Sequence, residues 1–226
     1  MAKLKTIFEC EACGNQQSKW MGKCPQCGAW ESFIELSSQQ IKVSQELAKL
    51  TKTTKNATPI SQIQIEQIKR KSTGDNELDL VLGGGVVSGS LVLIGGSPGI
   101  GKSTLLLKIA SNLASSNQKV LYVSGEESAS QIKLRADRLN ANSDNLFLLT
   151  EIDLSSILAE VAKNEYKTIV IDSIQTLYSD KISSAPGSIS QVREITFELM
   201  RLAKKDDITI FIIGHITKDG TIAGPK

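Results

Sequence analysis

One stretch, "GGSPGIGKST" at residues 95–104, constrains the fold of this 226-residue chain more than any other feature. It follows the apolar run "SLVLI" and precedes the helix-like run "LLLKIASNLA". Gly96, Gly101, Lys102 and Ser103 complete the pattern G-x4-G-K-[ST], and the strand before it and helix after it distinguish a P-loop from a simple glycine-rich turn. The sequence therefore predicts an α/β protein that binds nucleotide phosphates.

The residue types in this loop indicate how it would bind ATP. Glycines let backbone N–H groups close on the phosphates, and the helix N-terminus adds its positive dipole end. Lys102 is expected to reach the β- and γ-phosphate oxygens during catalysis, and Ser103 to ligate Mg²⁺. The expected ATP contacts are Gly96, Ser97, Pro98, Gly99, Ile100, Gly101, Lys102, Ser103 and Thr104.

Apolar runs and helical periods alternate along the rest of the chain. Strands alternating with helices imply right-handed crossovers and a mostly parallel sheet covered on both faces. The continuous apolar runs "TIVIDS" and "ITIFIIG" agree, because buried parallel strands lose the alternating pattern. The expected strands are 90–95, 119–124, 145–149, 168–172 and 208–213, and the expected helices are 102–115, 128–139, 154–163 and 188–204.

Four titratable residues end or follow the expected strands, at the sheet edge where such folds place their chemistry. Asp172 is positioned as a Walker B carboxylate that holds Mg²⁺, although a strand can also end in Asp as a plain cap. Of Glu126 and Glu127, one could accept a proton from the attacking water and the other could be only a helix N-terminal charge. His215, the only histidine, is either a γ-phosphate sensor or an ordinary loop residue.

All four cysteines lie near the N-terminus with the spacing C-x2-C-x10-C-x2-C, as Cys10, Cys13, Cys24 and Cys27. Two such turns supply the tetrahedral four-sulfur shell that structural Zn²⁺ prefers. Disulfides and an iron site are the alternatives, and the lack of a secretory signal disfavours disulfides. We expect a small four-cysteine zinc ribbon over residues 1–36.

Both tryptophans of the chain, Trp20 and Trp30, lie in this ribbon near Lys19 and Lys23. The rings and the lysines could form a stacking and phosphate-binding surface for single-stranded nucleic acid. A miniature zinc fold has almost no core, however, so the rings are expected rather to cover the metal knuckles.

A polar segment separates the ribbon from the P-loop region. Residues 37–60 are rich in Ser, Thr, Gln and Lys and are predicted to be a linker, so the ATPase core is expected over 61–226. The net charge of +2 excludes no class of partner. The N-terminus has no apolar signal region and no stretch approaches a membrane span, so a cytoplasmic location and no membrane partner are expected.

Seven motifs resemble one family along nearly the whole chain. They are "CEACG…WMGKCPQCGAW", "STGDNELDLVLGGGVV", "LIGGSPGIGKSTLLL", "YVSGEES", "IDSIQTLYS", "APGSISQVRE" and "GHITKDGTIAGPK". Together they resemble the bacterial RadA/Sms family of RecA-like DNA-repair ATPases. The resemblance implies an N-terminal zinc finger and a RecA-like motor that binds single-stranded and branched DNA, promotes branch migration in homologous recombination and assembles as a homo-oligomeric ring.

The resemblance also implies roles for individual residues. Glu126 matches the catalytic glutamate, Asp172 the Walker B aspartate, and His215 the place of the RecA-type glutamine switch. Residues 179–194, with Lys181 and Arg193, are a candidate DNA-contacting channel loop, or else a plain surface connection. The segment "GTIAGPK" would open a second channel loop.

The family continues beyond this motif into a K-N-R-F-G segment and a Lon-protease-like domain, so the chain is expected to be a truncated piece. A recombinase or replicative helicase is a possible partner. Two other functions stay open: a signalling or timing ATPase resembling the KaiC family, and a zinc-organised nucleotide-binding module that recruits partners.

Overall fold

The computed structural model describes residues 7–36, 59–62 and 69–215. The predicted linker at 37–60, apart from its last two residues, lies outside the described residues, as does the expected second channel loop. The chain divides into two compact units, with the ribbon in the first and the P-loop region in the second. Each unit is described by itself below.

The ribbon is a small antiparallel sheet with the order β2-β1-β3. Its strands are β1 (Ile7–Cys10), β2 (Gln16–Gln17) and β3 (Phe33–Leu36). Cys10, Cys24 and Phe33 form its buried core, with Phe8 and Cys13 packed against them. So few apolar side chains cannot hold a fold together alone, which is typical of domains that rely on a metal. A short 3-10 helix, η1 (Ile60–Gln62), follows in the chain and belongs to none of the sheets.

The second unit is built on a five-stranded sheet in which every neighbouring pair is parallel. Its strands are β6 (Leu91–Gly96), β7 (Val120–Ser124), β8 (Leu146–Thr150), β9 (Thr168–Asp172) and β10 (Thr209–His215). They are arranged in the order β6-β10-β9-β7-β8. The predicted α/β fold with a mostly parallel sheet and a preceding four-cysteine ribbon is confirmed.

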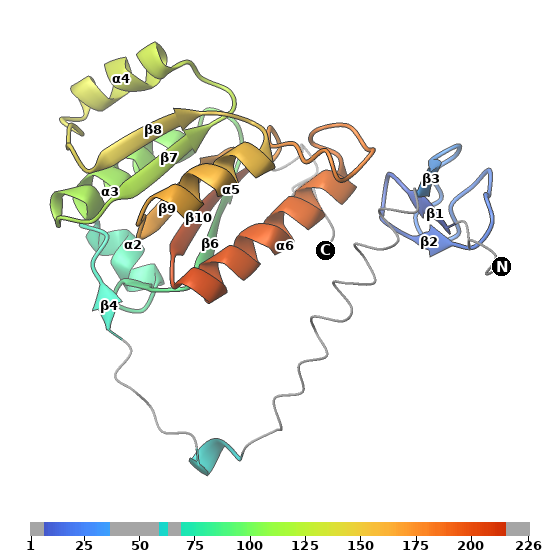
Figure 1. Cartoon of the computed structure of the whole chain (residues 1–226), viewed down its shortest axis with the longest axis horizontal. Helices are drawn as coiled ribbons and strands as arrows, with labels where there is room; N and C mark the ends of the chain where they lie inside the picture. Colours follow the sequence, from blue (N-terminus) through green and yellow to red (C-terminus); the bar gives the residue numbers. More distant parts are fainter. Residues whose placement is uncertain (1–6, 37–58, 63–68, 216–226) are drawn as a thin grey trace. The chain divides into compact units, whose positions relative to one another are not determined.

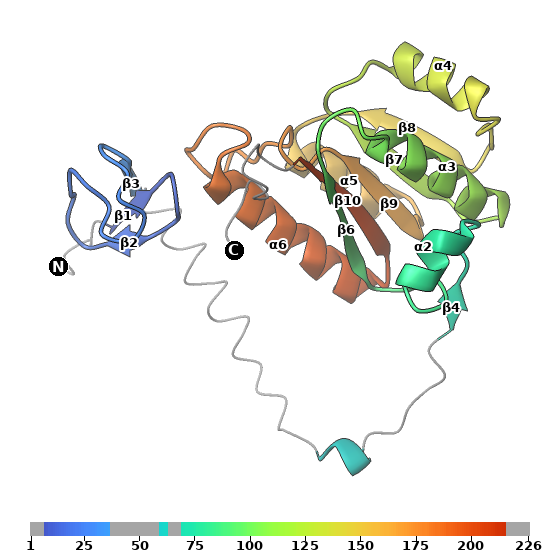
Figure 2. The same cartoon turned by 180° about the vertical axis from the view of Figure 1, so that it is seen from behind.

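Helices cover both faces of this sheet (Figures 1 and 2). Side chains of α5 (Leu154–Lys163) and α6 (Ile189–Asp206) pack with Leu121, Ile169 and Ile210 on one face. On the other face, α3 (Lys102–Ser115) and α4 (Ala129–Arg138) pack with Tyr122, Val170 and Phe211, and α2 (Asn76–Val81) packs at its border. The strands β7 and β9 are buried along their whole length, as their continuous apolar sequences predict.

An antiparallel pair of short strands, which the sequence patterns did not reveal, precedes the parallel sheet in the chain. β4 (Arg70–Lys71) pairs antiparallel with β5 (Val86–Val87) across α2 and three glycines. At Gly85 the backbone has φ +115°, and a Cβ atom there would lie 2.3 Å from the Lys71 carbonyl oxygen. Only glycine fits this close approach of two backbone segments. Two-residue strands carry too little periodicity to be recognised in a sequence.

Two expected boundaries differ from the structure in ways that concern candidate site residues. The strand predicted at 208–213 continues to His215, so the histidine ends a strand rather than following one. Arg193 belongs to α6 and is not part of a loop, because Ser188 caps that helix and it begins at Ile189. Only Lys181 of the two basic residues lies in the loop before α6.

None of the helices in the described ranges combines the length and the apolar character needed to span a bilayer.

Leu199→Ala should destabilise the protein by about 2–5 kcal/mol, because Leu199 is 0% exposed between α6 and the sheet and its removal leaves a cavity. The control is Leu134→Ala on α4, where the side chain is 64% exposed and the change should stay within about 0.5 kcal/mol. Urea unfolding of both variants measures the difference, and equal losses would contradict the packing described here.

Candidate functional site

The parallel register aligns the carboxyl ends of four strands. Gly96 at the end of β6 pairs with His215 at the end of β10, and Ser124 at the end of β7 pairs with Asp172 at the end of β9. β10 also pairs with β9, which links the two pairs into one sheet edge. The sheet therefore gathers at one edge the P-loop, the histidine and the acidic residues that the sequence placed after separate strands.

The P-loop connects β6 to α3, and this helix differs from its neighbours at its N-terminus. Gly101 caps α3 with a left-handed backbone, φ 101°, and makes no side-chain capping hydrogen bond. The other α-helices of the described ranges have side-chain caps, from Asp75, Ser128, Asp153 and Ser188. The first N–H groups of α3 are thus left for another acceptor, which is the arrangement that binds phosphate at helix N-termini.

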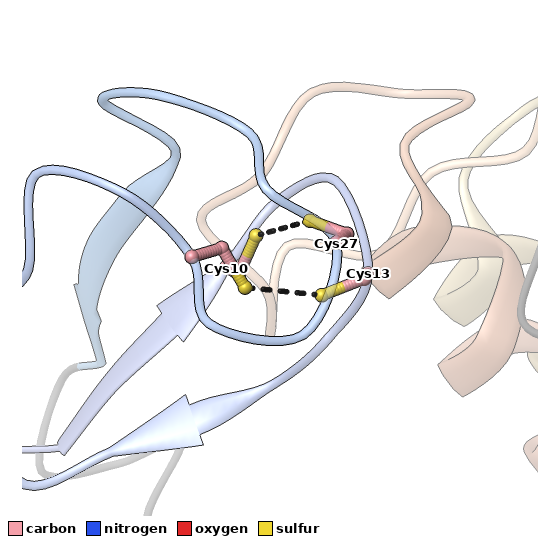
Figure 3. A group of neighbouring side chains, drawn as sticks. Cys10, Cys13 and Cys27 are labelled. Carbon is pink, nitrogen blue, oxygen red and sulfur yellow. Dashed lines mark hydrogen bonds between the residues drawn. The ribbon is translucent and has the colours of Figure 1, made fainter.

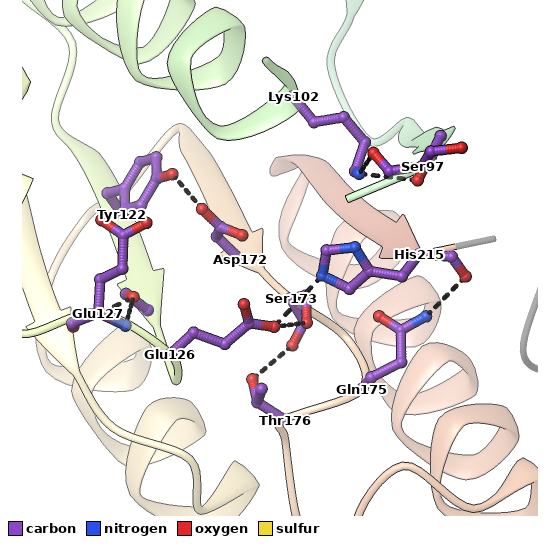
Figure 4. A network of polar contacts seen from close by, with 12 residues as sticks. Ser97, Lys102, Tyr122, Glu126, Glu127, Asp172, Ser173, Gln175, Thr176 and His215 are labelled. Atoms are coloured by element: carbon purple, nitrogen blue, oxygen red, sulfur yellow. Dashed lines mark hydrogen bonds and ion pairs between the residues drawn. The ribbon is translucent and has the colours of Figure 1, made fainter. Parts of the chain in front are cut away.

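Lys102 is the first residue of α3 and its side chain folds back over the loop (Figure 4). Its Nζ donates to the carbonyl oxygens of Gly96 at 2.7 Å and Ser97 at 2.8 Å, and the residue is only 7% exposed. These carbonyl partners are neutral, so the buried ammonium group can still form an ion pair with an anion. Ser103 follows it in the first turn, at a half-buried position. This donor set fits the phosphates and Mg²⁺ of a bound nucleotide.

Asp172 ends β9 and is 7% exposed. Its Oδ2 accepts a hydrogen bond of 2.6 Å from the hydroxyl of Tyr122 on β7 (Figure 4). Burial of the ring, and then the charge of Asp172, hold the pKa of Tyr122 far above its usual value. The phenol therefore stays protonated and acts as a permanent donor to this carboxylate.

Glu126 lies two residues beyond β7 and points toward the ends of β9 and β10 (Figure 4). Its Oε1 accepts a hydrogen bond of 2.7 Å from Ser173 Oγ and lies 3.3 Å from His215 Nε2. Gln175 Nε2 donates to the His215 carbonyl oxygen at 3.4 Å. Within the described ranges, His215 Nδ1 and Gln175 Oε1 are buried without a hydrogen-bond partner. Such groups are expected where a ligand or water completes a polar network.

Glu127 has a different environment from its neighbour. Its Oε1 accepts from Arg135 Nη2 at 2.6 Å, in an ion pair between the loop and α4. Its backbone N–H also donates to Ser124 Oγ at 3.2 Å. Glu127 is thus tied to the helix that follows it, which matches the helix-charge role weighed for one of the two glutamates.

The loops after β7 and β9 are packed tightly together. Gly125 N donates to the Asp172 carbonyl oxygen at 3.0 Å, and a Cβ at this glycine would lie 2.3 Å from Thr176 Oγ1. Thr176 Oγ1 in turn donates to the Ser173 carbonyl oxygen at 2.8 Å. This contact fixes the backbone from which Glu126 projects.

The four cysteines converge in the ribbon, where Cys10, Cys13 and Cys27 point toward one another in Figure 3. All four sulfur atoms lie within 4.8 Å of one another, with Cys10–Cys27 at 3.7 Å and Cys13–Cys24 at 3.5 Å. Sulfurs about 2.3 Å from one tetrahedral ion are about 3.8 Å apart. A disulfide needs about 2.05 Å, so the cysteines are free thiols and the set fits a metal ion.

Polar groups around the sulfurs shift the pKa values of two thiols in opposite directions. Burial alone would raise the pKa of Cys24, but the N–H groups of Cys27 and Gln26 and hydrogen bonds from Cys13 and Asn15 lower it to about 6. Burial raises the pKa of Cys13 to about 12, helped by its cysteine neighbours. Metal binding must therefore release at least the Cys13 proton at neutral pH.

The two tryptophans do not cover the metal knuckles, so that interpretation of the sequence is wrong. Trp20 is 54% exposed and Trp30 is 72% exposed. Phe8 and Phe33 take the covering role, since these two rings pack with the cysteines. Lys23 Nζ lies 5.3 Å from the Trp30 ring centroid, close enough for a cation–π contact.

The structure also adds residues that sequence reasoning missed. Tyr122, Ser173, Gln175 and Arg135 all contact a candidate site residue. Tyr122 and Ser173 sit inside apolar strands or their ends, and only strand pairing tells which side chain each one meets. No sequence signal distinguishes them from ordinary core or turn residues.

Two family profiles match the chain. One, described as "AAA domain", matches residues 57–221. The other, described as "Rubredoxin metal binding domain", matches residues 8–35, which include the four cysteines.

Curated relatives match the whole chain. A protein named "DNA repair protein RadA" from Campylobacter jejuni is 68% identical over 226 residues, which cover all of this chain and 51% of the relative. Proteins of the same name from Helicobacter pylori strain J99 and Bacillus subtilis strain 168 are 60% and 50% identical, and the chain covers 50% of each. The chain thus spans about half the length of these relatives.

We expect one Zn²⁺ per chain, because four thiolates fill a tetrahedral shell and leave no open position. Affinity should fall as the pH is lowered from neutral, because the metal must displace the Cys13 proton, and it should fall more steeply below about pH 6, where Cys24 is protonated as well. Elemental analysis and chelator competition across pH test this. Cys24→Ser should lose the ion, whereas Ser18→Ala on the exposed ribbon surface should keep it. Iron in place of zinc, or no metal at all, would contradict the prediction.

Proposed function

Because this chain belongs to the AAA domain family and its resemblance to the RadA DNA-repair proteins extends over its full length, we propose that it is the nucleotide-binding part of a DNA-dependent ATPase. This ATPase would act in homologous recombination and DNA repair. The observation that carries the proposal is the N-terminus of α3, which has no side-chain cap and over which Lys102 folds, at the same sheet edge as Asp172 and Glu126. Phosphate binding and an acidic group for hydrolysis need this juxtaposition.

ATP would bind through the loop from Gly96 to Thr104. Backbone N–H groups of the loop and of the first turn of α3 would contact the phosphates, and Lys102 would exchange its carbonyl partners for phosphate oxygens. Ser103 and Asp172 would hold Mg²⁺, which supplies charge neutralisation at the phosphate oxygens. Mg²⁺ and ATP are therefore the cofactors that we assign to this edge of the sheet.

Glu126 is the residue that we assign as general base. The contacts from Ser173 and His215 both use its Oε1, so Oε2 is available to take a proton from the attacking water. Glu127 is engaged by Arg135 instead. His215 contacts Glu126 and ends the strand beside the P-loop, a position from which it could transmit the state of the γ-phosphate to residues that follow it.

The nucleic-acid and assembly part of the proposal rests on the RadA resemblance. We propose single-stranded and branched DNA as ligands, branch migration as the work performed, a homo-oligomeric ring as the working form, and a recombinase or replicative helicase as a further partner. In the described part of the chain, Lys181 is an exposed cation before α6 that a phosphate backbone could contact. The second expected channel loop lies outside the described residues.

Glu126→Gln should bind ATP normally and lose hydrolysis by about 10²- to 10⁴-fold, because the amide cannot accept the water proton. Glu127→Gln is the matched control at the adjacent position. It should lose only the Arg135 ion pair and keep most of the activity. Lys102→Ala should weaken ATP binding itself, since it removes the cation at the phosphates.

These variants are compared by equilibrium ATP binding in the 226-residue chain and by hydrolysis, with and without single-stranded DNA, in a form extended to the length of the RadA relatives. Loss of hydrolysis in Glu127→Gln with retention in Glu126→Gln would reverse the assignment of the base. A wild-type rate that single-stranded DNA leaves unchanged would favour a timing or recruitment ATPase.

Single-stranded DNA should also quench the tryptophan fluorescence of the chain, because both tryptophans lie exposed in the ribbon. Trp30→Ala should weaken binding by about 5- to 150-fold if a base stacks on this ring. Met21→Ala removes a neighbouring exposed apolar side chain without a ring and serves as the control. Unchanged fluorescence and unchanged affinity would exclude the ribbon from the DNA contact.

A further inference from the structure

Tyr122 is a polar residue in the middle of a fully buried strand. It is 1% exposed and lies on the face of β7 that packs against α3 and α4. Its backbone partner on β9 is Val170, and Asp172 is the next residue of β9 on the same face. The tyrosine hydroxyl therefore reaches along the sheet toward its carboxyl edge, where Asp172 lies.

The contact that results is short and permanent. Tyr122 donates to Asp172 Oδ2 at 2.6 Å, and both residues are buried. Within the described ranges, the Asp172 side chain makes this one hydrogen bond. A hydrogen bond from a neutral donor to a charged acceptor in a buried setting is strong, and it sets the rotation of the carboxylate about its Cβ–Cγ bond.

We propose that Tyr122 is a positioning residue that orients Asp172 for Mg²⁺ binding. The inference rests on the proposed function, in which Asp172 holds the ion beside the nucleotide. With Oδ2 occupied by the phenol, Oδ1 is the oxygen presented to the ion or to one of its waters. Tyr122 itself touches neither nucleotide nor metal and acts only through Asp172.

Groups of this kind behave in a known way in metal sites. A partner that hydrogen-bonds a ligating carboxylate fixes its orientation, and removal of that partner typically costs about 10- to 100-fold in metal affinity. The loss should appear in the Mg²⁺ dependence of nucleotide binding and not in the contacts that the P-loop makes by itself.

The chain offers a closely matched control in Tyr166. This residue is also buried, at 3% exposure, and its hydroxyl donates to a carboxylate, Glu160 Oε1, at 2.9 Å. Burial, followed by the Glu160 interaction, raises its pKa to about 12, so it too stays protonated. Tyr166 belongs to the core on the opposite face of the sheet, with α5 and α6.

The experiment compares Tyr122→Phe, Tyr166→Phe and Asp172→Asn with the wild type, using a fluorescent ATP analogue. Its affinity for the 226-residue chain is measured in EDTA and then over a Mg²⁺ titration, and urea unfolding confirms that each variant is folded. Tyr122→Phe should keep the EDTA affinity and need about 10- to 100-fold more Mg²⁺ for half of the Mg²⁺-dependent gain. Tyr166→Phe should match the wild type in both measurements.

The outcomes separate the inference from the function on which it rests. A wild type that fails to bind the analogue, or a Mg²⁺ gain that persists in Asp172→Asn, overturns the proposed function of the site. A Mg²⁺ dependence that is normal in Tyr122→Phe but lost in Asp172→Asn overturns only the role of Tyr122. An equal shift in Tyr122→Phe and Tyr166→Phe would show a general packing effect and would also overturn it.

Discussion

The candidate site depends on the parallel hydrogen-bonded register of β6, β10, β9 and β7. The pairs Gly96–His215 and Ser124–Asp172 lie at the ends of these strands, so residues from four distant parts of the chain meet at one edge. Since neighbouring strands lie about 4.8 Å apart, the intervening strand β10 separates β6, which leads into the P-loop, from β9, which ends at Asp172, by about 10 Å. His215 ends β10, between these two strands.

Two identical side chains at this edge have different surroundings. Glu126 and Glu127 follow the same strand, yet one contacts Ser173 and His215 and the other pairs with Arg135 of α4. The close approach of Gly125 to Thr176 packs the loop that carries both glutamates against the loop after β9. Two carboxylates with the same intrinsic chemistry thereby acquire different partners, and the proposed choice of Glu126 as the base rests on this difference.

The ribbon follows a different physical logic from the sheet. Its core is three buried residues, two of which are cysteines, so the metal shell and not apolar burial must supply its stability. Trp20 and Trp30 are not part of this small core, and their rings are largely exposed to solvent. Both rings are therefore accessible to a ligand, as the proposed stacking on single-stranded DNA requires.

The sequence by itself determined the α/β class, the five sheet strands, the P-loop and the four-cysteine cluster, because each depends on local spacing and periodicity. α3 and α5 begin and end where the helical pattern predicted. The β4–β5 strand pair was not predicted, because a strand of two residues is too short to show an alternating sequence pattern.

Only the tertiary structure decided which side chains meet. The order of strands places His215 beside Gly96 and Ser173 beside Glu126, and it brings Tyr122 to Asp172, fifty positions along the chain. It also left the tryptophans exposed, against the expectation that their rings cover the metal knuckles. Such contacts depend on which strands pair and in what register, and the free energy of pairing is shared over the whole sheet, so no local pattern records it.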